Sequence, residues 1–145
     1  MLVNVLSKFP KLSDIQNIEN LSTILFDLDG TLLDTELIHA VALKKTLEIL
    51  SPTLTYSDNE LKELFNGMTD VDVYKKLNLN KITFEVFLKT KNNQFISIMR
   101  VENNLLDSNI RNFLNDLKKA KYSMALVTAS ERDVAMALLE HTEII

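Results

Sequence analysis

The sequence predicts an α/β fold in which a parallel sheet carries an inserted all-helical segment. Two apolar runs, residues 22–28 and 123–128, have the composition of buried strands. Helical patterns fill the sequence between these runs and resume after the second one. A strand, a crossover and a second strand imply a parallel pair, and both runs are apolar enough to be covered by helices on each face.

Composition narrows the class of protein. The chain has 145 residues, of which 46% are hydrophobic and 25% charged, as in ordinary globular proteins. The net charge of -4 comes without a basic stripe, so nucleic acid is not an expected partner. Because the sequence has no cysteine, a disulfide, a thiolate nucleophile and a zinc-thiolate cluster are excluded.

The first 21 residues are predicted to be a variable lead-in that forms a short helix or lies loose. Pro10 and the polar patch after it argue against a long regular element. The short apolar start is not followed by a small-residue cleavage site, so secretion is not expected. Nowhere does an apolar stretch approach the roughly 18 residues of a membrane-spanning helix. We therefore expect a cytoplasmic protein with no membrane partner.

The first strand, "STILFDL" at residues 22–28, is rich in β-branched and aromatic residues and runs into an Asp-Gly turn. A helix is expected next, over residues 36–50, with only Lys44 interrupting an apolar face, and Ser51-Pro52 ends it. That predicted face comprises Leu37, Ala40, Val41, Lys44 and Leu47.

Three more helical segments complete the insertion at residues 36–104. Ser57 is a plausible cap for the first and Gly67 its stop, Thr69 caps the second, and the third spans roughly residues 83–103. A further amphipathic helix after Asp107 then leads to the second strand, and a last helix starts near residue 130.

Carboxylates follow the first strand. Asp27 and Asp29 stand at its carboxyl end, where parallel sheets collect ligands. Two acids so close together require a cation or a shared proton, and a hard cation such as Mg²⁺ leaves positions open for phosphate oxygens. Gly30 allows a sharp turn that aims successive amides at an anion, and Thr31 adds a hydroxyl.

The stretch "ILFDLDGTLLDTE" resembles the first motif of the haloacid dehalogenase-like (HAD) superfamily. The resemblance implies that Asp27 is the nucleophile and Asp29 the acid/base. It also implies that the side chain of Asp27 and the main-chain carbonyl of Asp29 bind Mg²⁺. "MALVTAS" is similar to the second motif and assigns Thr128 to the transferring phosphoryl group. Ala129 and Ser130 would assist at the next helix N-terminus, where Ser130 is equally explained as a plain N-cap.

The insertion resembles the helical cap of phosphoglycolate phosphatase-like and β-phosphoglucomutase-like enzymes. A partial Rossmann-like HAD core at residues 22–35 and 105–145 would then carry a cap at 36–104. His39 falls where some relatives have a histidine that orients substrate or acid/base groups, although a partly buried helix histidine is the simpler interpretation. Asp34 is expected at a hinge rather than at the pocket rim. Asp70 stands where mutase-like relatives carry an arginine for a second phosphate, which disfavours mutase chemistry.

The resemblance covers residues 22–145 and leaves two family motifs without a counterpart: a lysine and a later pair of acids. Lys118, Lys119 and Lys121 precede the second strand, so they cannot supply that lysine. We therefore expect a C-terminally truncated chain with a bare strand edge, poorly stable alone or covered by a partner chain.

The function implied is a Mg²⁺-dependent phosphohydrolase that acts on a small phosphorylated metabolite, a phosphomonoester, through an aspartyl-phosphate. Two alternatives stay open. One is a non-catalytic remnant that binds phosphate, metal or a partner chain, and the other is a phosphomutase.

Overall fold

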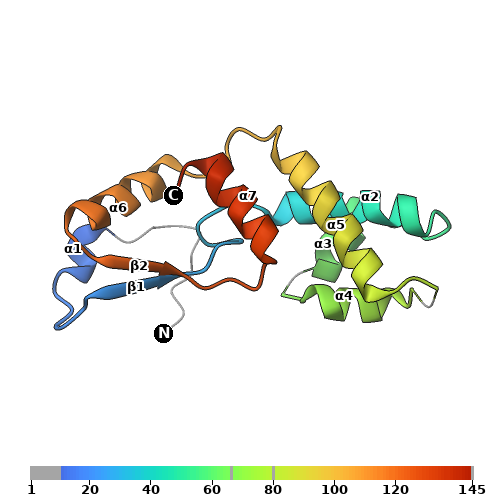
Figure 1. The fold of residues 1–145 in the computed structure, drawn as a ribbon, viewed down its shortest axis with the longest axis horizontal. Helices are drawn as coiled ribbons and strands as arrows, with labels where there is room; N and C mark the ends of the chain where they lie inside the picture. The colour runs from blue at the N-terminus through green and yellow to red at the C-terminus, as the bar shows by residue number, and fades with distance from the viewer. Residues whose placement is uncertain (1–10, 66, 80, 145) are drawn as a thin grey trace.

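The computed structural model describes residues 11–65, 67–79 and 81–144 (Figure 1). The predicted lead-in therefore lies partly outside the described residues, at positions 1–10, and the rest of it contains a short helix, α1 (Leu12–Ile15). The order of elements after α1 is strand, four helices, helix, strand and helix. This is the α/β arrangement with an all-helical insertion that the sequence predicts.

The two predicted strands pair in parallel. β1 (Thr23–Phe26) and β2 (Ser123–Leu126) run in a register that sets Thr23 beside Ser123 and Phe26 beside Leu126. Each is shorter than the apolar run that predicted it. The parallel pairing brings the carboxyl ends of both strands to the same edge, and this is what makes a shared site there feasible.

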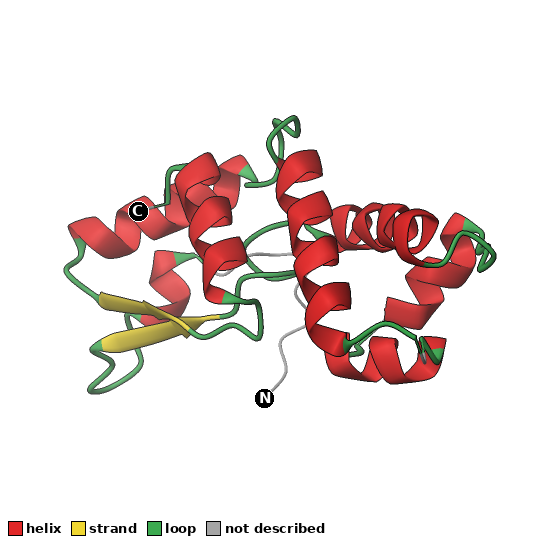
Figure 2. Ribbon diagram, turned by 45° about the vertical axis from the view of Figure 1, so that its right-hand side comes forward, coloured by secondary structure: helices red, strands yellow, loops and turns green. Residues whose placement is uncertain are grey.

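The expectation that helices cover both faces of the sheet is wrong for the described chain. Leu25 is 65% exposed and Val127 59% exposed, whereas Phe26 packs edge-to-face on Phe113 with ring centroids 6.5 Å apart. The reason is the position of α6 (Ser108–Lys119) and α7 (Arg132–Thr142), which lie on the same side of the strands (Figures 1 and 2). Among the described residues, one apolar face of the sheet is therefore left exposed to solvent.

Four helices form the insertion, as predicted: α2 (Glu36–Leu50), α3 (Asp58–Phe65), α4 (Asp70–Leu77) and α5 (Phe84–Met99). The predicted caps are in place. Thr69 and Thr83 accept hydrogen bonds from the third residue after each, both at 3.3 Å. Ser57 and Glu60 exchange bonds in a capping box. Local capping chemistry therefore sets where α3, α4 and α5 begin.

The predicted apolar face of α2 is wrong in part. Leu37 is 67% exposed, whereas the helix buries Ile38, Ala40, Ala42, Leu43, Thr46 and Leu47. These buried residues span more than one stripe because α2 contributes to two hydrophobic clusters at once. A helix buried on two sides does not show the single apolar stripe that a surface helix shows.

The first cluster, called here the distal cluster, is built within the insertion and comprises Leu43, Leu47, Leu61, Val73, Leu77, Leu79 and Phe87. The second, the central cluster, joins the strand end, the inner halves of α2 and α5, and α7. Its buried members are Leu28, Leu32, Leu33, Ile38, Ala42, Phe95, Met99, Leu105, Val134, Ala135 and Leu138. The central cluster thus continues across the predicted boundary between core and insertion.

The two connections that cross this boundary are hydrogen-bonded to each other. The main-chain N–H of Asp34 donates to the carbonyl of Leu105 at 3.1 Å. Asp34 therefore lies where the two connections meet, and its role as a hinge stays a prediction. In the part of the chain that the structure describes, no helix is long and apolar enough to cross a membrane.

Candidate active site

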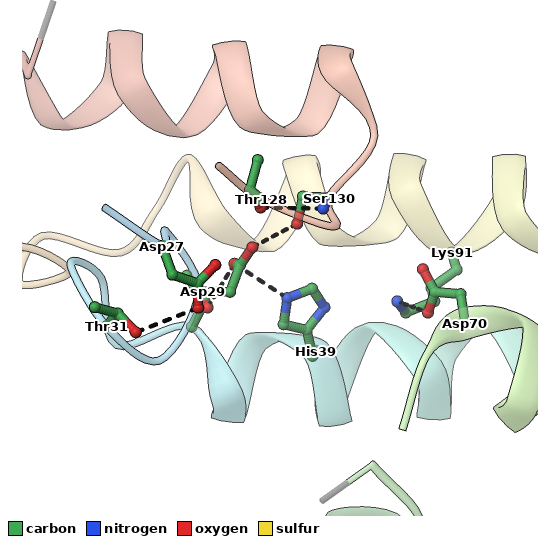
Figure 3. A network of polar contacts seen from close by, with 9 residues as sticks. Asp27, Asp29, Thr31, His39, Asp70, Lys91, Thr128 and Ser130 are labelled. Carbon is green, nitrogen blue, oxygen red and sulfur yellow. Dashed lines mark hydrogen bonds and ion pairs between the residues drawn. The ribbon is translucent and has the colours of Figure 1, made fainter. Parts of the chain in front are cut away.

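Both acids after β1 leave the strand on the same side. The residue between the acids, Leu28 in the turn after β1, is completely buried in the central cluster. Asp27 and Asp29 therefore face away from that cluster, toward the loop after β2 (Figure 3). Asp27 is exposed, whereas Asp29 is half-buried.

The turn after the acids closes on itself. Gly30 has a φ of +69°, which favours glycine, as the sequence predicts. Its N–H donates to the carbonyl of Leu33 at 2.8 Å, and the N–H of Leu33 donates to Leu28 at 3.0 Å. The prediction that successive amides of this turn point at an anion is therefore wrong for Gly30, because the turn itself uses that amide.

The carboxylate of Asp27 is only weakly hydrogen-bonded. The hydroxyl of Thr31 donates to its Oδ2 at 3.3 Å, a long hydrogen bond near the surface. The carboxylate is thus exposed to solvent, where a reacting group could approach it. Figure 3 shows it beside Asp29 and Thr31.

Asp29 is held from three directions. Its Oδ1 accepts from the hydroxyl of Thr35 at 2.7 Å and lies 3.3 Å from Nε2 of His39. Its Oδ2 accepts from the hydroxyl of Ser130. Burial raises the pKa of Asp29, but the hydrogen bonds from His39, Ser130 and Thr35 together lower it by more than burial raises it. The pKa of Asp29 therefore lies below its ordinary value of 3.8. In this arrangement Asp29 is a carboxylate at neutral pH.

The loop after β2 lies across the candidate site from the turn that carries the two acids (Figure 3). The hydroxyl of Thr128 accepts from the N–H of Ser130 at 3.1 Å, and Ala129 lies between these two residues. The N-cap of α7 is Glu131, so the interpretation of Ser130 as a plain N-cap is wrong. Its hydroxyl reaches 101 residues back along the chain to Asp29 instead.

His39 connects the acids to the insertion. It projects from the first turns of α2, and its ring lies against that of Phe95 on α5, with centroids 4.4 Å apart. Its side chain is 22% exposed and contacts Asp29. The two interpretations of this residue are thus compatible: it is partly buried, and it also touches the candidate acid/base.

Sequence reasoning missed Thr35. This residue is completely buried and occupies the N-cap of α2, but its hydroxyl makes no cap hydrogen bond, because it donates to Asp29. The sequence did contain a signal for this contact: Thr35 is a residue type that caps helices, it directly precedes the predicted helix, and it follows Asp29 by six positions. Such a residue predicts a cap first, and only the folded turn shows that the hydroxyl is used elsewhere.

Sequence reasoning also missed the partner of Asp70. This acid starts α4 and forms an ion pair with Lys91 of α5, whose residue is only 2% exposed. A signal was present: Lys91 stands four positions from Phe87 and four from Phe95, inside an apolar stripe. A lysine in such a stripe needs a buried or partly buried anion.

Metal ligands are sparse among the side chains of residues 11–65, 67–79 and 81–144, where no group of three or more histidine, cysteine, aspartate or glutamate residues could hold a metal ion. The carboxylate of Asp27 is exposed at this edge and could serve as a single ligand to a cation. Both side-chain oxygens of Asp29 are engaged by protein donors.

A family model described as haloacid dehalogenase-like hydrolase matches residues 24–145. A search of curated proteins found no match. Among solved structures, CbbY from Rhodobacter sphaeroides in complex with phosphate is similar, with a TM-score of 0.74 and 22% identity over 83% of this chain. A CbbY mutant in complex with xylulose 1,5-bisphosphate gives a TM-score of 0.70 at 22% identity over 83% of this chain.

A HAD hydrolase of family IA, variant 3, from Entamoeba histolytica is also similar, with a TM-score of 0.68 and 20% identity over 83% of this chain. At these identities the likeness shows a shared fold. The alignments cover 56% of each CbbY chain and 54% of the Entamoeba chain, so this chain spans about half the length of its structural neighbours.

Proposed function

The chain belongs to the haloacid dehalogenase-like hydrolase family, and from this premise we propose that its site hydrolyses a small phosphomonoester through an aspartyl-phosphate. The observation that carries the proposal is the hydrogen bond between Ser130 and Asp29. It joins the ends of the two strands, so that one acid is fixed beside the loop proposed to hold phosphate and the other stays approachable.

Asp27 is the proposed nucleophile. An oxygen of its exposed carboxylate attacks phosphorus, a bond from that oxygen to phosphorus forms, and the bond from phosphorus to the leaving alcohol oxygen breaks. Water then attacks the phosphorus of the aspartyl-phosphate and regenerates the carboxylate. The weak hold of Thr31 on Asp27, at 3.3 Å, supports this role because the oxygen loses little when it reacts.

Asp29 is the proposed acid/base. It gives a proton to the leaving alcohol in the first step and takes one from the attacking water in the second. The hydrogen bonds that lower its pKa suit the second role, in which a carboxylate is needed. For the first role it must gain a proton, and His39, 3.3 Å away, is the group with which it can share one.

The phosphoryl oxygens are proposed to bind at the loop after β2. Thr128 supplies a hydroxyl and Ala129 its amide, while Ser130, whose N–H donates to Thr128 and whose hydroxyl donates to Asp29, is proposed to hold these two residues in place at the site. Thr31 is proposed to add a hydroxyl from the opposite side, and Gly30 to contribute the shape of the turn rather than its amide. Backbone and hydroxyl donors at the start of a helix favour an anion.

Mg²⁺ is the proposed cofactor. An all-oxygen donor set with an exposed carboxylate fits this ion, which binds through one or two carboxylates and keeps several waters. The carboxylate of Asp27 and the main-chain carbonyl of Asp29 would hold it, because the side-chain oxygens of Asp29 are engaged. When bound, the ion neutralises charge on the phosphoryl group. The proposed substrate, a phosphorylated metabolite, is supported by the phosphate and xylulose 1,5-bisphosphate bound in the two CbbY structures.

The test is hydrolysis of p-nitrophenyl phosphate with and without Mg²⁺. We expect activity that falls by about a thousandfold or more in Asp27→Asn. The matched control is Asp116→Asn, an exposed acid on α6 whose contact with Lys119 is at the surface, which should keep full activity. Activity that survives Asp27→Asn would remove the mechanism, and a wild-type chain without activity would remove the proposal that this chain is sufficient.

A partner-binding role is a second candidate, and the exposed sheet face favours it. Leu25 on β1 and Val127 immediately after β2 leave apolar area in solvent on the same face of the sheet. Sedimentation at rising protein concentration distinguishes the two candidates. A stable monomer whose mass does not change would argue against a partner at this face.

A further inference from the structure

A hollow of about 140 Å³, called here the distal hollow, lies between the C-terminal end of α2, the loop that follows it and α3. Its floor is the surface of the distal cluster, formed there by Leu47 and Leu61, which are 2% and 1% exposed. Leu47 follows His39 on α2 by a rise of about 12 Å along the helix axis. Figure 1 shows this end of α2 and the two strands at opposite ends of the molecule. The distal hollow is therefore separate from the candidate active site.

The loop after α2 forms one side of the distal hollow. In the stretch "SPTLTY", residues 51–56, the alternate residues Pro52, Leu54 and Tyr56 all line it. Leu54 and Tyr56 are half-buried because they pack on the distal cluster, which holds them in place while part of each side chain stays accessible. A leucine and two rings beside a leucine floor suit a ligand with a flat apolar body, since aromatic rings pack well in offset or edge contact.

Charges of both signs also line the distal hollow. Lys44 and Glu48 are one helical turn apart on α2, so they lie on the same face of the helix, and their formal charges cancel. A charged ligand would therefore meet one like charge as well as one opposite charge. Thr55 and Tyr56 add hydroxyl groups, which can donate or accept a hydrogen bond. This lining favours an uncharged ligand that carries a polar substituent.

The volume of the distal hollow limits the ligand to one ring. An apolar cavity of about 150 Å³ holds a benzene molecule, and the distal hollow has nearly this volume. We propose that the distal hollow is a binding site for an uncharged monocyclic phenol, whose ring contacts Leu47 and Leu61 and whose hydroxyl faces Thr55 and Tyr56. This site is independent of the proposed phosphohydrolase function.

The experiment is an NMR titration of the full chain with phenol, in which the shifts of assigned main-chain amides report where the ligand binds. We expect saturable shifts at Leu54, Thr55 and Tyr56, with a dissociation constant of about 1 mM, as befits so small a ligand. The absence of saturable shifts would overturn the proposal. Saturable shifts centred on Leu25 and Val127 would also overturn it, because they would assign the ligand to the exposed sheet face.

Two charged compounds of similar size test the ligand class. Benzoate and benzylamine carry a negative and a positive charge on the same ring, and each should bind at least about tenfold more weakly than phenol. If either compound bound as tightly as phenol, the assignment of an uncharged ligand would be wrong.

Two matched tryptophan substitutions test the location. Thr53 and Thr55 are both exposed in the same loop, but only Thr55 lines the distal hollow. Thr55→Trp should weaken phenol binding by about tenfold or more, because the indole ring takes the place of the ligand, whereas Thr53→Trp should leave the affinity unchanged. Equal affinities in the two variants would contradict binding in the distal hollow.

A third variant changes the size of the distal hollow instead of closing it. Leu54→Ala removes a half-buried side chain from the lining and should raise the preference for 2-naphthol over phenol by about tenfold relative to the wild type. This variant still decides the matter if Thr55→Trp does not fold. An unchanged preference in folded Leu54→Ala would show that the phenol binds elsewhere.

Discussion

Asp27 and Asp29 are two residues apart at the end of one strand, yet their surroundings differ sharply. Asp27 is exposed and receives one long hydrogen bond, from Thr31. Asp29 is half-buried and receives hydrogen bonds from three parts of the chain. One acid is therefore coupled to the fold by hydrogen bonds, while the other is exposed and weakly held. Stability measurements should separate the two acids even where activity measurements do not.

The largest expected effect is the stability cost of removing each acid. Asp29→Ala should lower the free energy of unfolding by about 2–3 kcal/mol, because it leaves the buried hydroxyl of Thr35 without its acceptor and removes charge-assisted bonds. Asp27→Ala should change it by less than about 0.5 kcal/mol, as is usual at exposed positions. Urea unfolding of both variants without divalent metal checks this. Equal costs would show that the contrast between the acids is only apparent.

A smaller effect is expected when the donors are changed and the acids kept. Thr35→Val should cost about 1–2 kcal/mol, since it conserves shape but removes the donor to Asp29. Thr31→Val is the matched control, because it removes the equivalent donor to exposed Asp27 and should cost less than about 0.5 kcal/mol. The same unfolding assay applies. If Thr31→Val were the more costly of the two, Asp27 would be the acid held by the fold.

The features that the sequence predicts correctly are those that depend on nearby residues. Helix positions follow local chemistry, so α2 begins and ends where the pattern predicts, and Thr69 and Thr83 cap their helices as expected. Parallel pairing follows from the crossover rule. These features depend on neighbours a few residues apart, which a single sequence displays directly.

Features that depend on distant segments were predicted less well. The contact of Ser130 with Asp29 spans 101 residues, and the family resemblance placed the two near one site without indicating that they touch. The pair of Asp70 and Lys91 was missed because each residue alone has an ordinary local explanation. The exposed face of the sheet was missed because strand composition reports apolarity and not which helices arrive to cover it.

The last and smallest expected effect concerns pH, and it isolates Asp29. Its folded-state pKa is below its ordinary value of 3.8, so its contribution to stability is complete above about pH 3.8 and is lost as the pH falls through the lower, folded-state pKa. The unfolding free energy of the wild type should therefore fall more steeply with acid in this range than that of Asp29→Asn. Glu60 and Asp72 also have lowered pKa values and act in the same direction, but both variants keep them, so they cancel in the difference. Asp27→Asn controls for the loss of one carboxylate. Parallel acid profiles for the wild type and Asp29→Asn would mean that the three hydrogen bonds hold Asp29 no more firmly in the folded chain than water does in the unfolded one.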